Sequence, residues 1–404
     1  MADALAHLVV DGNEVLQFKL VREPEDIEDD DTTFGPEMCH QVFGENENIF
    51  GYTDLKIKLY YSEASLQTYL GISYSDKIDP KTSGGLKPDD VEGALRKVLA
   101  PGYVTNIDEF VSMLKKDKQF KPHGVLVQSF STVNREGGES QEFEVYYCET
   151  STPGFQAYHE RLQTFLLWYV DAASFIDVDD DRWTFFTVFE KYRSSTGGTR
   201  YAVAAYATVY RYYAYPRHLR PRISQVLTLP PYRKMGICAN LLQAIYSHFI
   251  LHSEVVDITV EDPSDDFQRI RDYVDAKLCE TLSAFHPAKL TQRFTAEMAS
   301  QAQNKLKINK KQARRVYEIL RLKNTNLSDK SAYLQYRLDV KNRLNAPYQK
   351  KKLEMKKLQK VLKPDEYAAA ITTTGMSETQ ARLSTQYLAL EDDYRRVVHR
   401  MQIE

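Results

Sequence analysis

Cysteine is scarce in this sequence, and long apolar runs are absent. The four cysteines lie far apart and form no CxxC pair, so neither a disulfide framework nor a structural zinc site is expected. No apolar run approaches the roughly 18–20 residues that a membrane span needs. No lysine or arginine precedes Lys19, so the basic start of a signal peptide is missing. We therefore expect an intracellular, soluble protein that does not bind a membrane.

The length and the charge distribution set further limits. A chain of 404 residues with 43% hydrophobic residues is too long for one ordinary core, so two or three domains are expected. The net charge of −3 is unevenly spread, because residues 304–363 carry 19 Lys and Arg against four acidic residues. Such a basic run is most often a solvated helical face, but it could also bind an acidic partner such as nucleic acid. The acidic remainder would suit a basic partner.

The order of the predicted elements divides the chain into four segments. The first segment mixes strands and helices and includes an alternating strand at 54–62. From about residue 124 strands and helices alternate, and beyond about residue 283 only helical patterns remain, the clearest at 309–320. The sequence therefore predicts an α/β (α+β) protein. Its predicted segments are a mixed N-terminal domain at 1–122, an α/β domain at 123–282, a helical domain at 283–345 and a basic helical tail at 346–404.

Within the α/β segment, the patterns predict a mixed sheet covered by helices. A long apolar helix is predicted at 158–175. The strand at 223–229, the helix after it and the strand at 255–260 predict a right-handed parallel crossover. The remaining predicted features are strands at 124–133, 142–150, 183–192 and 201–215, a turn at Gly137-Gly138 and a linker at 368–379.

The stretch "RKMGICANLL" at 233–242 is the first candidate binding site. It follows Pro230-Pro231 at the end of a predicted strand, and Gly236 lies in the first turn of the next helix. Backbone N–H groups at a helix N-terminus, together with the helix dipole, favour an anion such as phosphate. However, a single glycine is more often a residue of tight packing, and the stretch matches neither GxxxxGK[ST] nor GxGxxG. The turn alone leaves both interpretations open.

The pattern R-x-x-G-x-small in this turn resembles the acetyl-CoA motif of the GNAT N-acetyltransferase superfamily. Longer stretches, between about residues 16 and 345, resemble the catalytic subunits of type B histone acetyltransferases. These stretches are "YHERLQTFLLWYVDAASFIDVDDDRW", "FEKY", "RPRISQ", "DITVEDPSDDF" and "INKKQARRVYEILRL". The resemblance implies a mixed GNAT sheet and lysine N-acetyltransferase activity, with acetyl-CoA as co-substrate and no metal.

The resemblance also implies a substrate and partners. Relatives acetylate lysines in the N-terminal tail of free, newly made histone H-four before chromatin assembly. They work with a WD-repeat histone-binding subunit, in the nucleus and the cytoplasm. Two rival functions stay open at this point. One is a GNAT-fold acyltransferase for another basic protein or amine, and the other is a non-catalytic protein that binds histones or nucleic acid.

By the resemblance, the pantetheine arm of acetyl-CoA lies along the strand before the motif, and the pyrophosphate lies on the turn. Two residues depart from the family pattern. Cys238 stands where relatives usually carry Gly or Ala, and Lys234 replaces a small residue that is common among them. The implied cofactor-binding residues are Val226, Leu227, Thr228, Arg233, Lys234, Met235, Gly236, Ile237, Cys238 and Ala239.

Acetyl transfer to lysine also needs a general base, because free lysine titrates near pH 10.4 and must lose its proton before it attacks. A carboxylate could accept that proton if desolvation or a neighbouring charge raises its pKa toward ~7. "ITVEDP" places Glu261 and Asp262 at the end of a predicted strand, where open α/β sheets bind ligands. A solvated strand end explains the same residues equally well. The resemblance makes Glu261 the principal base, with Asp262 and Asp171 as auxiliary carboxylates, although relatives often carry Glu in place of Asp171.

Acidic and aromatic residues are candidates for substrate recognition. The "GENEN" loop at 44–48 offers carboxylates to a basic peptide, and "YRYYAY" at 210–215 offers rings to the stem of a lysine. Solvated loop acids and a packed sheet face are the plainer interpretations. The resemblance favours binding of the histone tail. The implied substrate-binding residues are Glu45, Asn46, Glu47, Trp183, Tyr210, Arg211 and Tyr212.

Overall fold

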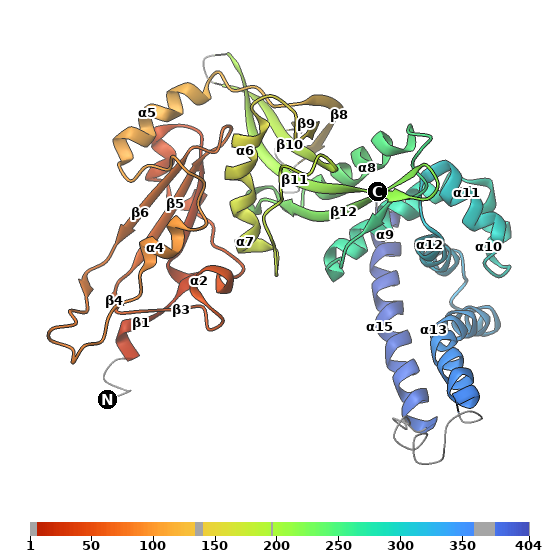
Figure 1. Ribbon diagram of the computed structural model, residues 1–404. Helices are drawn as coiled ribbons and strands as arrows, with labels where there is room; N and C mark the ends of the chain where they lie inside the picture. The colour runs from red at the N-terminus through yellow and green to blue at the C-terminus, as the bar shows by residue number, and fades with distance from the viewer. Residues whose placement is uncertain (1–5, 134–139, 195–196, 359–375, 404) are drawn as a thin grey trace. The chain divides into compact units, whose positions relative to one another are not determined.

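The computed structural model describes residues 6–133, 140–194, 197–358 and 376–403 (Figure 1). The chain forms two compact units. The first comprises Met1–Tyr213 with Pro221–His248, and the second comprises Ala214–Arg220 with Phe249–Glu404. The predicted turn at Gly137-Gly138 lies outside the described residues, as does the predicted linker at 368–379 up to residue 375.

Small sheets form the N-terminal part of the first unit. The largest has the order β2-β5-β6, with β2 parallel and β6 antiparallel to β5. The predicted strand at 54–62 is confirmed by β5, where Ile57 and Leu59 are buried, as is Leu55 just before the strand. The elements of this part are β1 (Val9–Asp11), α2 (Gly12–Val15), β2 (Leu16–Val21), α3 (His40–Phe43), β3 (Asn48–Phe50), β4 (Tyr52–Thr53), β5 (Lys56–Ser62), β6 (Thr68–Ser73), β7 (Asp76–Lys77), α4 (Val91–Arg96) and α5 (Ile107–Asp117).

The main sheet has the strand order β13-β12-β11-β10-β9-β8. The pairs β8–β9, β9–β10 and β10–β11 are antiparallel. The predicted strands are confirmed, but the one predicted at 255–260 contains only Thr259–Val260, because Val255 and Ile258 form isolated bridges. The bridge from Val255 to Leu219 is parallel, as the predicted crossover requires. The strands are β8 (Val125–Val133), β9 (Ser140–Glu149), β10 (Trp183–Arg193), β11 (Thr199–Ala214), β12 (His218–Thr228) and β13 (Thr259–Val260).

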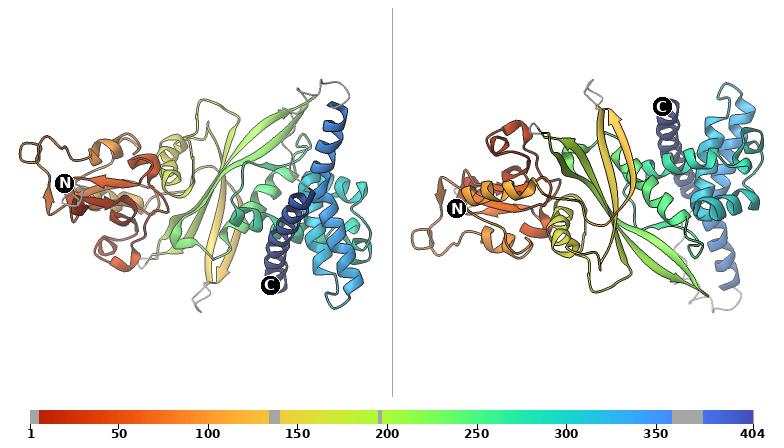
Figure 2. Two further views of the ribbon diagram at one scale, coloured as in Figure 1. Left: turned by 90° about the horizontal axis from the view of Figure 1, so that it is seen from below. Right: turned by 90° about the horizontal axis from the view of Figure 1, so that it is seen from above.

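The helices between β9 and β10 lie between the small sheets and the main sheet (Figure 2). On the side of the small sheets, Trp168 packs against Phe18, with ring centroids 5.7 Å apart. On the side of the main sheet, His159 lies 4.6 Å from the ring of Phe185, and its Nε2 is 2.8 Å from the hydroxyl of Tyr206. These helices are α6 (Phe155–Leu162) and α7 (Leu166–Tyr169), joined by a 3-10 turn at Gln163–Phe165. A further helix, α8 (Ile237–Ile250), follows β12 in the chain.

The single helix predicted at 158–175 is wrong beyond Tyr169. Val170 has extended backbone angles, and Ala172 has a positive φ of 53°. The side chain of Gln41 binds both backbone groups of Ala173, donating to its carbonyl at 2.8 Å and accepting from its N–H at 3.2 Å. These tertiary hydrogen bonds replace the helical ones, so an apolar pattern alone placed the helix end too late.

The second unit is helical beyond β13. Helix α12 confirms the helix predicted at 309–320, because Ala313, Val316, Tyr317 and Leu320 are all fully buried. The helices are α9 (Asp265–Glu280), α10 (Pro287–Leu290), α11 (Ala296–Leu306), α12 (Lys310–Lys323), α13 (Lys330–Leu358) and α15 (Met376–Ile403).

The last helix is part of this helical packing. Helix α15 runs beside α13 (Figure 1) and also packs on α9 and α12. It buries Tyr387, Tyr394 and Val397, and the hydroxyl of Tyr394 donates to Glu318 at 2.9 Å. Helix α13 continues without a break through residue 345, which is the predicted end of the helical domain. No helix in the described part of the chain is long and apolar enough to cross a membrane.

Candidate active site

The strand β12 leads directly into the turn that contains Gly236. Along its end Leu227 and Leu229 are buried, whereas Val226 and Thr228 are half-buried. The backbone N–H of Leu229 donates to the carbonyl of Ala204 at 2.9 Å, which ties the end of the strand to β11. A 3-10 turn at Pro230–Tyr232 follows, and α8 begins at Ile237. The residues between them, Arg233–Gly236, form the surface of the turn.

The turn is open on its outer side and needs left-handed backbone angles. Lys234 has a φ of +64° and Gly236 a φ of +79°. A Cβ on Gly236 would meet nothing nearer than Asn240 Nδ2, at 4.0 Å. The backbone angle therefore favours glycine at this position, and close packing does not. This excludes the interpretation of Gly236 as a residue of tight packing. Asn240 fixes the carbonyl of Gly236, with its N–H at 3.2 Å and Nδ2 at 3.1 Å.

Positive side chains surround this open turn. Lys234 is exposed and Arg233 is half-buried. The Arg233 guanidinium donates to the carbonyl of Thr228 at 3.3 Å and lies 5.3 Å from the centre of the Tyr169 ring. It also forms an ion pair with Glu37. An open helix N-terminus with two cations fits an anionic diphosphate. Sequence reasoning missed Glu37 and Tyr169, because nothing in the local pattern of either residue marks it as a neighbour of this turn.

The predicted carboxylate Asp171 lies just after α7 and is 78% exposed. Its Oδ1 is 3.3 Å from His40 Nε2, and His40 Nδ1 is 3.8 Å from Glu47 Oε1. His40 therefore lies between a predicted catalytic carboxylate and a predicted substrate-binding carboxylate. Local sequence does not mark this histidine, because Asp171 is more than a hundred residues away from it along the chain.

Glu47 has a structural role in the "GENEN" loop. Its Oε1 accepts hydrogen bonds from the N–H groups of Cys39, at 2.6 Å, and His40, at 3.1 Å, at the start of α3. Its Oε2 accepts from Asn13 Nδ2 at 3.0 Å. The hydrogen bond from Cys39 is the main reason that the pKa of Glu47 lies below its usual value, and the bond from Asn13 adds to it. Glu45 and Asn46 are exposed at the tip of the same loop.

Three predicted substrate-binding residues form one aromatic cluster. Trp183 pairs with Tyr210 across β10 and β11, and their rings meet edge to face with centroids 4.8 Å apart. The ring of Tyr212 lies 4.5 Å from that of Tyr210. Because side chains alternate along a strand, Arg211 points elsewhere, and its Nη1 is 3.3 Å from Glu149 Oε1. The structure therefore separates Arg211 from the aromatic cluster.

Charged residues border the aromatic cluster. The hydroxyl of Tyr210 donates to Asp180 Oδ2 at 2.9 Å, and the Arg182 guanidinium lies 4.9 Å from the centre of the Tyr210 ring. The Arg222 guanidinium lies 4.7 Å from the centre of the Tyr212 ring. The bidentate hydrogen bonds from Arg182 hold the pKa of Asp180 well below its usual range. The rings of the cluster are thus bordered by one carboxylate, which is paired with Arg182, and by two guanidinium groups.

The predicted base lies in the second unit. Glu261 and Asp262 directly follow β13, and both are exposed. Asp262 has a positive φ of 27°. The next helix, α9, is capped by Ser264, whose side chain accepts a hydrogen bond from the N–H of Phe267 at 3.2 Å. Two exposed carboxylates therefore occupy a tight connection between a strand and a helix. Among the described residues, no group of three or more His, Cys, Asp or Glu could hold a metal ion.

Comparison with known proteins gives consistent matches. The family model "Histone acetyl transferase HAT1 N-terminus" matches residues 8–171, and "Histone acetyltransferase type B catalytic subunit, C-terminal" matches residues 271–322. The histone acetyltransferase type B catalytic subunit of Rattus norvegicus is 46% identical over 98% of this chain and 94% of that protein. The one of Homo sapiens is 45% identical over the same shares. The one of Cryptococcus neoformans is 32% identical over 85% of this chain and 90% of that protein.

Proposed function

Because the chain belongs to the family of histone acetyltransferase type B catalytic subunits, we propose that it acetylates lysines in the N-terminal tail of free, newly made histone H-four, before chromatin assembly. The observation that carries this proposal is the 46% identity over 98% of the chain. The enzyme is an acyltransferase, and acetyl-CoA is its acetyl donor.

The turn Arg233–Gly236 is the proposed site for the pyrophosphate of acetyl-CoA. Arg233 and Lys234 would bind its negative charges, while the backbone of Gly236 allows a close approach. The half-buried strand end at Val226 and Thr228 would bind the pantetheine arm through backbone groups, next to Leu227. The start of α8, from Ile237 through Cys238 and Ala239, completes the site with Met235. When bound, acetyl-CoA supplies an acetyl group activated as a thioester.

The proposed general base is Glu261. Its carboxylate would accept a proton from the lysine ammonium, directly or through one water, and leave a neutral amine that can attack. Asp262, the next residue along the chain, is proposed as an auxiliary carboxylate. Asp171 is proposed as a further carboxylate, and its contact with His40 gives it a partner that can donate or accept a proton.

The aromatic cluster of Trp183, Tyr210 and Tyr212 is the proposed contact for the lysine stem. Ring faces suit both the aliphatic carbons and the positive end of lysine. The exposed Glu45 and Asn46 are proposed to contact basic residues elsewhere on the histone tail. Glu47 would act on the tail indirectly, because its carboxylate already binds the start of α3. Arg211, which is bound to Glu149, would support the sheet behind the cluster.

A WD-repeat histone-binding subunit is the proposed partner, and the nucleus and cytoplasm are the proposed locations. The rival function in nucleic-acid binding has less support. Part of the basic run at 304–363 is neutralised within the helical unit, where Arg314 and Arg343 pair with the fully buried Glu318. Arg315 likewise pairs with the fully buried Asp272 at 2.6 Å. These arginines stabilise the fold and are not an open cationic face.

Incubation of the pure protein with labelled acetyl-CoA and a mixture of core histones tests the substrate. We expect the label on lysines near the N-terminus of free histone H-four and much less label on nucleosomes. A panel of short basic peptides from other proteins serves as the comparison. Equal labelling of unrelated basic peptides would support the broader acyltransferase instead, and an absence of any transfer would contradict the proposal.

A further inference from the structure

A hydrogen-bonded network of Arg22 and two buried glutamates joins the N-terminal strands to the main sheet. Arg22 Nε lies 2.8 Å from Glu63 Oε2, and Arg22 Nη2 donates to Glu190 Oε2 at 2.5 Å. Glu63 directly follows β5, and Glu190 lies in β10. The two glutamates are only 3% and 4% exposed. Because a buried polar group without a hydrogen-bond partner costs free energy, these contacts tie the positions of the three side chains to one another.

Tyr232 connects this network to the acetyl-CoA turn. Its hydroxyl donates to Glu190 Oε2 at 2.8 Å and accepts from Arg22 Nη2 at 3.1 Å. Its ring is 5% exposed and meets the ring of Phe143 edge to face at 6.1 Å. Burial raises the pKa of Tyr232 well above its usual value, so the hydroxyl keeps the proton that it donates. Tyr232 directly precedes Arg233, so its fixed side chain also fixes the start of the turn.

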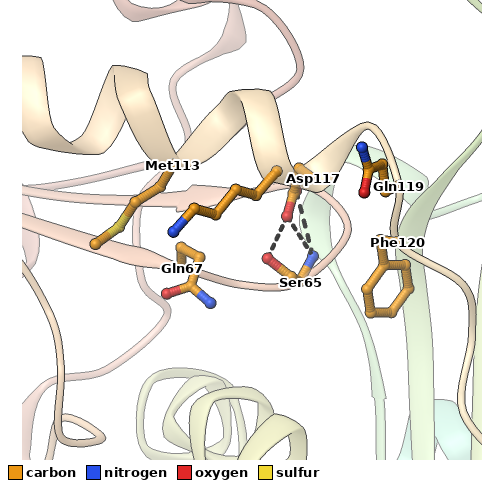
Figure 3. Close-up of a pocket in the computed structure, with 7 residues that line it drawn as sticks. Ser65, Gln67, Met113, Asp117, Gln119 and Phe120 are labelled. Carbon is orange, nitrogen blue, oxygen red and sulfur yellow. Dashed lines mark hydrogen bonds between the residues drawn. The ribbon is translucent and has the colours of Figure 1, made fainter.

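The N-terminal side of the network has its own support. Asp117, the last residue of α5, accepts a hydrogen bond from the N–H of Ala64 at 3.2 Å. It also accepts one from the N–H of Ser65 at 3.3 Å (Figure 3). The hydroxyl of Ser65 also donates to Asp117. These bonds hold the loop after β5 that begins with Glu63. A cavity of about 320 Å³ lies beside this support and is lined by Gln67 and Phe120, among others.

We propose that Glu190, together with Arg22, positions the acetyl-CoA turn through Tyr232 and thereby sets the affinity for acetyl-CoA. Glu190 is a positioning residue in this proposal, because it contacts the turn through another side chain and touches no substrate. The inference rests on the proposed assignment of Arg233–Gly236 to the pyrophosphate. It adds a chain of contacts through which the N-terminal part of the first unit affects the conformation of that turn.

The variant Tyr232→Phe tests the proposal, because it removes only the hydroxyl and keeps the ring against Phe143. We expect the Kd and the KM for acetyl-CoA to rise about tenfold, as for a lost hydrogen bond to a charged group. The kcat at saturating acetyl-CoA and the KM for the histone peptide should stay unchanged. Hydrogen exchange of the backbone N–H groups at 233–240 should become faster, since the turn loses its fixed start.

Tyr146→Phe is the matched control. Tyr146 also donates its hydroxyl to a nearly buried glutamate of the main sheet, Glu144, at 2.6 Å. A purely structural role would make the two variants alike, with similar losses of thermal stability and no change in acetyl-CoA affinity. That result would overturn the proposal. Glu190→Gln, which keeps an acceptor oxygen, should weaken acetyl-CoA binding less than Glu190→Ala, and the reverse order would also contradict it.

Two readouts separate this proposal from the assignment on which it rests. If Tyr232→Phe speeds exchange at 233–240 but leaves the acetyl-CoA Kd unchanged, the network orders the turn without serving acetyl-CoA, and the proposal is wrong. If Arg233→Ala also leaves the Kd unchanged in that experiment, the assignment of the turn is wrong as well. If Arg233→Ala weakens binding while Tyr232→Phe does not, only the positioning role fails.

Discussion

Arg233, at the start of the turn proposed to bind acetyl-CoA, forms an ion pair with Glu37 from the N-terminal part of the chain. The two side chains are 36% and 49% exposed. Exposed pairs of this kind contribute only about 0.2–1 kcal/mol, so the guanidinium can exchange its carboxylate partner for a phosphate. In the proposed site, the Glu37 carboxylate would therefore compete with the cofactor for Arg233.

Removal of this competitor should tighten acetyl-CoA binding. We expect Glu37→Gln to lower the Kd for acetyl-CoA by about two- to fivefold, because a weak exposed ion pair no longer has to break. Isothermal calorimetry at low salt measures the change. Glu28→Gln, another exposed acid of the same unit, controls for net charge. An unchanged or weaker affinity for Glu37→Gln would show that Glu37 assists the turn and does not compete.

The aromatic cluster should act on the histone peptide and not on acetyl-CoA. Tyr212→Ala removes a ring that is 41% exposed and lies 4.5 Å from Tyr210. We expect the peptide KM to rise about two- to tenfold, as for a lost aromatic contact. Tyr213→Ala is the matched control, because its side chain points to the opposite face of the same strand. Equal effects of the two variants on the peptide KM would exclude this face of the sheet as the lysine contact.

The buried carboxylate of Glu63 should make stability depend on pH. Burial raises its pKa to about 8, although Arg22 and Tyr192 oppose the shift and Glu190 and Asp117 reinforce it. The folded state therefore holds a proton that the unfolded state has lost, so this stabilisation is complete at acidic pH and is lost as the pH rises to about 8.

Thermal unfolding of wild type and Glu63→Gln measures this dependence. We expect the melting temperature of the wild type to fall relative to that of the variant between about pH 5 and pH 8. Glu25→Gln, at an exposed position, should instead follow the wild type throughout. A constant difference between wild type and Glu63→Gln over this range would mean that Glu63 is ionised in the folded state.

The sequence predicted most strands and the helix α12, because alternation and helical spacing are local signals. It did not predict the end of the helix at Tyr169, since the bonds from Gln41 to Ala173 come from a segment more than a hundred residues away. The packing of α15 was equally hidden. Its sequence looks polar and charged, and only the tertiary structure shows that Tyr394 binds the buried Glu318.

The candidate site shows the same division. Gly236 and the carboxylates after β13 could be found from local sequence, because a turn glycine and a strand end are readable patterns. The aromatic stretch stands out in the local sequence, but only the resemblance to relatives favoured peptide binding over a packed sheet face. The separation of Arg211 from the cluster follows from the alternation along β11. Glu37, His40 and the network around Glu190 could not be found, because their significance comes from residues that are remote in the chain.

The role of Glu261 as the general base is the central claim, and Glu261→Gln tests it most directly. The amide keeps the shape of the side chain but cannot accept a proton. We expect kcat at neutral pH to fall by ~10²–10⁴-fold, with the acetyl-CoA Kd unchanged and the acidic limb of the pH–rate profile flattened or moved. Asp265→Asn, an exposed acid at the start of α9, should keep wild-type kcat. A Glu261→Gln enzyme with near-normal kcat and the wild-type pH profile would contradict the account and shift the assignment to Asp262 or Asp171.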